Sequence, residues 1–206
     1  MFGFPCSSVA KHQAVTDVHR QVRNGPADPV RYTALDPKLQ LWVAACIYKG
    51  FEDSYEVLHG PPPAELFDVV YRHGARVATM LQVPPSMWPP DRTAFEAYWA
   101  EAEARIAMDD VTRAYLYDFA GLGFLPWPVP RLFGWFNRAV TAGFLPAAFR
   151  RELGLAWGPR EQRAFAVNRR VLRITNALTP RRLAALPFDL YLWYMQRRIR
   201  NKQRIL

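Results

Sequence analysis

Proline is the feature that most constrains the fold of this chain, because eighteen prolines divide its 206 residues into short segments. Proline inside a helix removes a hydrogen bond and clashes with the preceding turn, whereas it is tolerated at the first helical position. Two clusters stand out, at residues 60–63 (Gly-Pro-Pro-Pro) and 83–90 (Val-Pro-Pro-Ser-Met-Trp-Pro-Pro). Between the clusters, apolar residues recur at helical rather than alternating spacing. The sequence therefore predicts an all-α fold whose helices are separated by proline-rich connectors.

The expected helices follow from apolar spacing and from capping residues. Asp36-Pro37 has the order of an N-cap followed by a first-turn proline, and Asp91 is a second candidate N-cap. We expect helices at residues 8–24, 36–58, 64–81, 91–106, 109–119, 130–142, 159–177 and 187–202. Because no internal repeat divides the chain, these helices predict a single bundle-like domain of about eight helices over residues 1–206.

The positive charge of the chain is concentrated in its C-terminal quarter. The formal net charge is +9, yet residues 150–206 alone hold fourteen Lys and Arg against three Asp and Glu. A basic helix and tail at 187–206 can attract phosphates or anionic lipid head groups, which would give peripheral membrane contact. The other interpretation is a solvated helix face with a basic tail. Aromatic side chains do not alternate with the basic ones, so we expect no specific nucleic-acid binding.

Cysteine usage and apolar patterning favour a cytoplasmic protein. The two cysteines, Cys6 and Cys46, are too few for a disulfide scaffold, and the N-terminus lacks the order of a secretory signal. The most apolar region, residues 119–149, is interrupted by prolines and glycines and is not expected to span a membrane.

The aromatic region at 119–149 has four open interpretations. It would suit an apolar tunnel or a membrane-facing entrance, and it would equally suit ordinary core or a dimer surface. If the aromatic side chains of Phe133, Trp135 and Phe136 are exposed, they would favour a homodimer.

Few residues fall into patterns that indicate known chemistry. The four histidines do not form a His-Glu-x-x-His arrangement, and no nucleotide-binding or serine-hydrolase motif occurs. The acidic pairs Glu52-Asp53 and Asp109-Asp110 are adjacent in sequence, so their side chains diverge around a helix. We expect both pairs on solvated helix surfaces, and no catalytic residue can be assigned.

His19 is the most informative of the histidines. It borders an apolar row formed by Val15, Val18 and Val22, so its imidazole is expected at the core or its edge. One interpretation is a histidine that simply fills space in the core. The other is an axial ligand of a haem iron, with Arg20 or Arg23 meeting a haem propionate.

A succession of short motifs around His19 resembles a known oxygenase family. The first is the run at residues 18–25 (Val-His-Arg-Gln-Val-Arg-Asn-Gly). It is followed by residues 32–37 (Tyr-Thr-Ala-Leu-Asp-Pro), then Leu39, Leu41, Trp42 and Val43, then residues 81–84, 88–89, 95–99 and 153–155. This order resembles the catalytic domain shared by latex-clearing rubber oxygenases and the ER-bound oxygenase of mycophenolic acid biosynthesis.

The resemblance implies a helical domain that holds a b-type haem, with iron, and His19 is the position that matches the proximal iron ligand. It also implies cleavage of carbon–carbon double bonds with dioxygen in a hydrophobic, isoprenoid-like substrate. Members of this family usually have a helical region before the histidine helix, and we expect this chain to lack it. The alternative function is a non-catalytic helical interaction domain, or a membrane-associated one, derived from that family.

Overall fold

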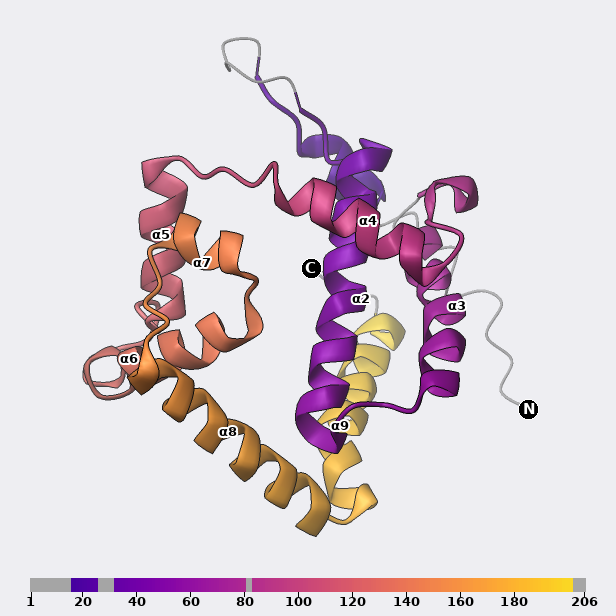
Figure 1. Ribbon diagram of the computed structural model, residues 1–206. Helices are drawn as coiled ribbons and strands as arrows, with labels where there is room; N and C mark the ends of the chain where they lie inside the picture. The colour runs from indigo at the N-terminus through magenta and orange to yellow at the C-terminus, as the bar shows by residue number, and fades with distance from the viewer. Residues whose placement is uncertain (1–15, 26–31, 81–82, 202–206) are drawn as a thin grey trace.

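The computed structural model describes residues 16–25, 32–80 and 83–201. Apart from an isolated bridge between Arg23 and Thr33, these residues form helices and connecting turns, which confirms the all-α expectation. Residues 16–21 are helical. The helices that follow, labelled in Figure 1, are α2 (Pro37–His59), α3 (Ala64–Met80), the 3-10 helix η1 (Pro85–Met87), α4 (Arg92–Glu103), α5 (Asp110–Ala120), α6 (Val129–Phe144), α7 (Ala147–Leu153), α8 (Pro159–Leu178) and α9 (Arg181–Arg200).

Aspartate caps begin three of these helices, and the sequence predicts two of them, Asp36 and Asp91. The Asp36 side chain accepts a hydrogen bond from the Lys38 backbone N–H at 2.8 Å, and Asp91 accepts one from Ala94 at 2.8 Å. These contacts satisfy backbone donors that lack a partner in the first turn. Asp109 caps α5 in the same way.

The structure differs from the sequence prediction at several helix ends and contains one additional helix. The first helix ends at residue 21 rather than 24, because the Asn24 N–H donates to the carbonyl of Tyr32 at 3.1 Å instead of continuing the helix. Residues 8–15 of that expected helix lie outside the described residues. Helix α7 was not predicted, and its seven residues are too few to show a helical period. Helix α9 begins at Arg181 rather than 187, since Pro187 is accommodated inside the helix.

The first part of the fold is built around aromatic rings from α2, α3, α4 and the connector that holds η1. Tyr48 and Phe95 are the largest fully buried side chains, and their ring centroids lie 5.0 Å apart in an edge-on arrangement. Tyr71 and Trp88 complete this cluster. Gly74 allows the close approach of α3, because a Cβ atom there would lie 2.8 Å from the Tyr48 ring.

Helices α5, α6 and α7 form a second, smaller part of the fold. Ala142, Leu153 and Leu155 make its buried centre. The Arg113 guanidinium ties α5 to the end of α7, since its Nε donates to the Glu152 carbonyl oxygen at 2.6 Å. Because the guanidinium is charged and the contact is partly buried, this hydrogen bond fixes the relative position of the two helices.

Helix α8 connects the two parts along the lower edge of the molecule (Figure 1). Near its start, the ring of Phe165 packs edge-on against Phe144 of α6, with centroids 5.2 Å apart. Near its end, Arg173 donates to the carbonyl oxygens of Val57 and Glu56 at 2.9 and 3.0 Å. These are the carbonyls of the last turn of α2, where a cation is favourable. The two parts of the fold are thus held at a defined separation.

We expect replacement of Phe95 by alanine to lower the free energy of unfolding by about 3–5 kcal/mol, because it removes a fully buried ring. Urea denaturation of the purified protein measures this loss. The matched control is Phe133→Ala, which changes a ring that is 55% exposed and should cost less than about 1 kcal/mol. Equal losses for the two variants would contradict the placement of the core.

Candidate functional site

His19 lies in the helical segment 16–21, which a backbone pairing joins to the start of α2. The Ala34 N–H donates to the Val22 carbonyl at 2.9 Å, and the Asn24 side chain accepts from the Tyr32 N–H at 2.9 Å. The His19 side chain is half-buried, and its Nδ1 atom is buried with no hydrogen-bond partner among the described residues. A buried polar atom left in this state costs free energy unless a ligand satisfies it.

The two arginines beside His19 are more exposed than the histidine itself. Arg20 forms an ion pair with Asp17, with 2.7 Å between its Nη1 and the Asp17 Oδ1. Arg23 is exposed and forms the isolated bridge with Thr33. The structure thus brings Arg20 and His19 onto one short helix and places Arg23 just beyond its end. Their propionate-binding role stays a prediction.

The apolar row beside His19 is less buried than the sequence suggests. Val18 and Val22 are exposed, and Val15 lies outside the described residues. The reason is that the chain leaves the helix after residue 21, so Val22 joins the backbone pairing rather than an apolar helix face. The valine row is therefore not part of the described core.

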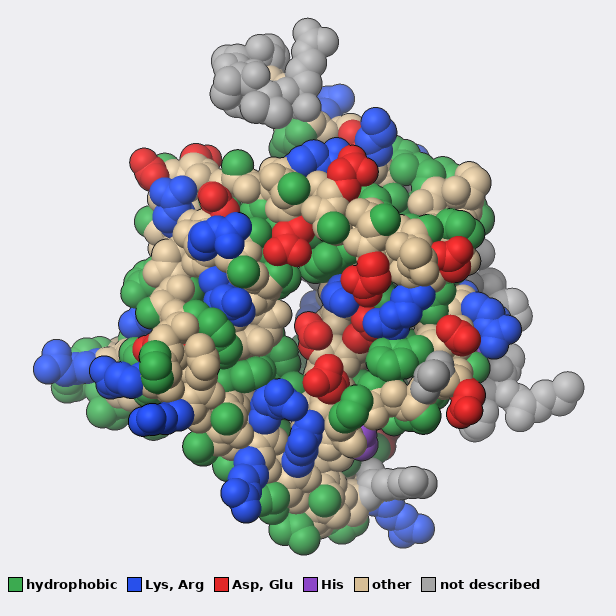
Figure 2. All heavy atoms as spheres, viewed as in Figure 1, with side chains coloured by type: hydrophobic (Ala, Val, Ile, Leu, Met, Phe, Trp, Pro, Cys, Tyr) green, Lys and Arg blue, Asp and Glu red, His purple; other side chains and the backbone are tan. Residues whose placement is uncertain are grey.

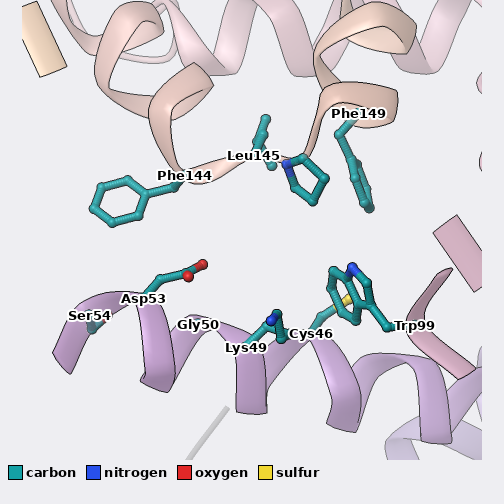
Figure 3. A pocket seen from close by; sticks show the side chains of 10 residues that line it. Cys46, Lys49, Gly50, Asp53, Ser54, Trp99, Phe144, Leu145 and Phe149 are labelled. Carbon is teal, nitrogen blue, oxygen red and sulfur yellow. The ribbon is translucent and has the colours of Figure 1, made fainter. Parts of the chain in front are cut away.

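A cavity of about 580 Å³ lies between the two parts of the fold. Its lower wall in Figure 3 is the middle of α2, and its upper wall is the turn between α6 and α7. The α2 side contributes small and polar residues, and the opposite side is apolar. The lining residues are Cys46, Lys49, Gly50, Asp53, Ser54, Trp99, Phe144, Leu145, Pro146 and Phe149. A volume of this size fits a small organic molecule.

The residues that the sequence analysis connected with haem do not line this cavity. Its α2 residues begin at Cys46, nine positions after the helix starts at Pro37. At about 1.5 Å per residue, this is roughly 14 Å along the helix axis. The His19 segment is therefore joined to the start of α2, whereas the cavity lies along the middle of that helix.

Burial controls the protonation of two side chains in the cavity wall. Burial raises the pKa of the Cys46 thiol to about 11, which keeps it neutral at physiological pH. Burial also raises the pKa of the Asp53 carboxyl above its usual value, an effect that the nearby Lys49 charge opposes. Lys49 itself lies 3.5 Å from carboxylate oxygens of both Glu52 and Glu96. The cavity thus has one weakly polar wall and one apolar wall.

Glu52 corrects the expectation that the Glu52-Asp53 pair lies on a solvated surface. Its side chain is only 8% exposed and accepts hydrogen bonds from the Tyr48 hydroxyl at 2.5 Å and from Arg92 at 2.6 Å. A buried carboxylate requires such partners. Asp109, by contrast, is exposed and caps α5, while the carboxylate of Asp110 pairs with Arg113 at 2.6 Å.

Sequence reasoning missed the cavity, although a signal for its α2 wall is present. Cys46, Lys49, Gly50 and Asp53 recur at i, i+3, i+4 and i+7, which places them on one face of the helix. The opposite wall has no such signal, because it depends on how α8 positions α6 and α7. Part of the aromatic region 119–149 does line the cavity, as Phe144 to Pro146 and Phe149 show.

The fold and the motifs around His19 agree with the comparisons to known proteins. The family model described as "ER-bound oxygenase mpaB/B'/Rubber oxygenase, catalytic domain" matches residues 7–174. The chain therefore belongs to this family of oxygenase catalytic domains. Uncharacterised proteins of Mycobacterium tuberculosis and Mycobacterium bovis are each 45% identical over 193 residues, covering 94% of this chain and 76% of the relative. No solved structure matches the chain.

The described part of the chain contains neither a cluster of metal-ligating side chains nor a helix that could span a membrane. No three His, Cys, Asp or Glu side chains in those ranges gather as a metal-binding group. None of the helices described there is long and apolar enough to cross a membrane. A haem iron, however, requires only one protein side chain, since the porphyrin supplies the other ligands.

The raised pKa of Cys46 predicts slow alkylation. In a Cys6→Ser background at pH 8, we expect iodoacetamide to react with the folded protein roughly a hundredfold more slowly than with the urea-unfolded protein. The rate should keep rising with pH up to about 11, because only the thiolate reacts. A mass-spectrometric time course measures it. Equal rates in folded and unfolded protein would contradict the burial of this thiol.

Proposed function

We propose that this protein is a haem-dependent oxygenase that acts with dioxygen on a hydrophobic, isoprenoid-like substrate, with His19 as the axial ligand of the iron. The observation that supports the proposal most directly is the buried Nδ1 of His19, which has no partner within the described ranges and lies in the region that the family model matches. When no described protein group forms a hydrogen bond with this ring nitrogen, a bound ligand can determine the orientation of the imidazole.

The residues around His19 are compatible with a haem b group. A half-buried histidine provides one neutral nitrogen donor, which is what a b-type haem takes from a helix. Arg20 and Arg23 are exposed residues close to His19 in sequence, and their guanidinium groups could pair with propionates. Arg20 would then share its charge between Asp17 and the propionate.

When bound, haem would supply the oxidative cleavage of a carbon–carbon double bond by dioxygen, and the protein would supply position and environment. The apolar wall of the cavity, with Phe144, Leu145 and Phe149, offers a surface for an aliphatic chain. Burial of such a chain is favourable by about 25 cal/mol per Å² of apolar area. Trp99 of α4 lies on the α2 side of the cavity, across from Phe149 (Figure 3), with its ring centroid 4.9 Å from that of Trp42.

Haem reconstitution tests the role of His19. We expect protein titrated with hemin to show a Soret band that saturates at one haem per chain, and the His19→Ala variant to lose or strongly shift that band. The matched control is His73→Ala, which changes an exposed histidine of α3 and should leave the spectrum unchanged. Imidazole added to His19→Ala should restore part of the band, because it replaces the missing ligand.

Two outcomes would contradict the proposal. One is absence of a saturable Soret band in the native protein, and the other is an identical spectrum in His19→Ala. Either result, obtained with protein of unchanged helicity, would favour the alternative of a non-catalytic helical interaction domain. The exposed rings of Phe133, Trp135 and Phe136 are the observation that favours this alternative.

A further inference from the structure

Helix α9 carries an exposed apolar row. Because each residue advances about 100° around a helix, the members of this row fall within one arc of roughly 100°. The row consists of Leu183, Leu186, Leu190, Trp193 and Tyr194, which are each between 48% and 59% exposed. Outside this arc, Phe188, Tyr191 and Leu192 are 74%, 63% and 52% exposed. The exposed apolar surface of α9 therefore extends beyond the row.

Such a row is not accounted for by the fold or by the family. Spacing of apolar residues at i, i+3, i+7 and i+10 normally marks the face that a helix buries. The described part of α9 contains no buried residue. The family match ends at residue 174, before α9 begins at Arg181. An exposed apolar surface of this kind indicates a binding partner.

The charges on α9 limit what that partner can be. The helix contains five arginines and one aspartate, with the arginines at both ends and Asp189 near the middle. Two copies of α9 would bring arginine against arginine in both the parallel and the antiparallel orientation. Like charges at these positions disfavour pairing of the helix with itself. The distribution of charge favours an anionic partner.

Helix α8 continues the same combination of apolar and basic side chains. Its exposed aliphatic row is Val167, Val171, Ile174 and Leu178. It also contains five arginines and one glutamate, and Arg163 and Arg170 are exposed. Figure 2 shows Lys and Arg along α8 at the lower edge, whereas Asp and Glu gather higher, over α2 and α4.

We propose that the exposed apolar and basic side chains of α9, together with those of α8, dock the protein onto an anionic lipid membrane surface. Apolar side chains would enter the boundary between head groups and acyl chains, and the arginines would contact lipid phosphates. Aromatic rings suit this boundary because one end is apolar and the other polar. The geometry at the C-terminal end fits this arrangement, with the Arg197 guanidinium 5.5 Å from the centre of the Trp193 ring. Long arginine side chains can then reach the head groups while the rings are inserted.

Nucleic acid is the competing anionic partner, and the apolar row argues against it. The phosphates of a nucleic acid would attract the arginines equally well. They offer no apolar surface, however, for the leucines and Trp193 of the row. A lipid surface satisfies both the charge and the apolar area.

Vesicle co-sedimentation of the full-length protein tests the proposal. We expect little binding to pure phosphatidylcholine and at least about tenfold more to vesicles with 30% phosphatidylglycerol. Binding should weaken as NaCl rises from 50 to 500 mM, because salt screens the attraction. Arg197→Glu/Arg200→Glu should lower binding to the anionic vesicles at least about tenfold, and Trp193→Ala at least about threefold.

Matched controls separate a specific surface from net charge and general apolarity. Arg105→Glu/Arg131→Glu has the same net charge as the arginine variant, but it changes exposed residues far from α9 in sequence and should bind normally. Trp127→Ala removes an exposed tryptophan from the turn before α6 and should also bind normally. Circular dichroism of every variant shows whether the helices are retained.

Four results would overturn the proposal. The first is equal binding to neutral and anionic vesicles, and the second is equal loss in variants and controls. The third is tight binding to duplex DNA that displaces the protein from vesicles and is unaffected by Trp193→Ala, which would assign the surface to nucleic acid. The fourth is a dimer in sedimentation equilibrium that Trp193→Ala dissociates, which would assign it to a second copy.

Discussion

The contact between Tyr48 and its neighbours is the interaction on which the rest of the structure depends. The ring of Tyr48 lies in the aromatic cluster with Phe95, and its hydroxyl donates to the buried carboxylate of Glu52. Glu52 in turn accepts from Arg92 at the start of α4. The side chain of Tyr48 thus joins the aromatic core to a charged network. The core and the network both hold α4 against α2. Breaking such a network leaves a buried charge without a partner, which costs more than the lost contact alone.

Helix α2 is connected to both candidate regions. The pairing of residues 22–24 with 32–34 attaches the His19 segment to the N-terminal end of this helix. The middle of the same helix forms one wall of the cavity. The proposed haem ligand and the proposed substrate surface are therefore related through a single helix.

Much of the helical architecture could be predicted from the sequence, because it depends on local signals. Asp36 and Asp91 begin helices where the capping pattern places them. Features that depend on contacts between distant segments could not be predicted. Glu52 looked like a surface residue because its partner Arg92 is forty positions away. Val22 looked like a core residue because its backbone pairing with Ala34 leaves no trace in the apolar spacing. The candidate site divides in the same way, since His19 was found by its motif whereas the cavity required the folded chain.

The attachment of α8 has a consequence for the size of the cavity. Its last turns are anchored to α2 through Arg173, and its first turns support α6 through the Phe165–Phe144 contact. The upper wall of the cavity is the turn that follows Phe144. None of the residues that line the cavity belongs to α8, yet α8 is in contact with both of its sides. The width of the cavity thus depends on a helix outside its walls, and a substitution at Arg173 or Phe165 would change that width without touching a lining residue.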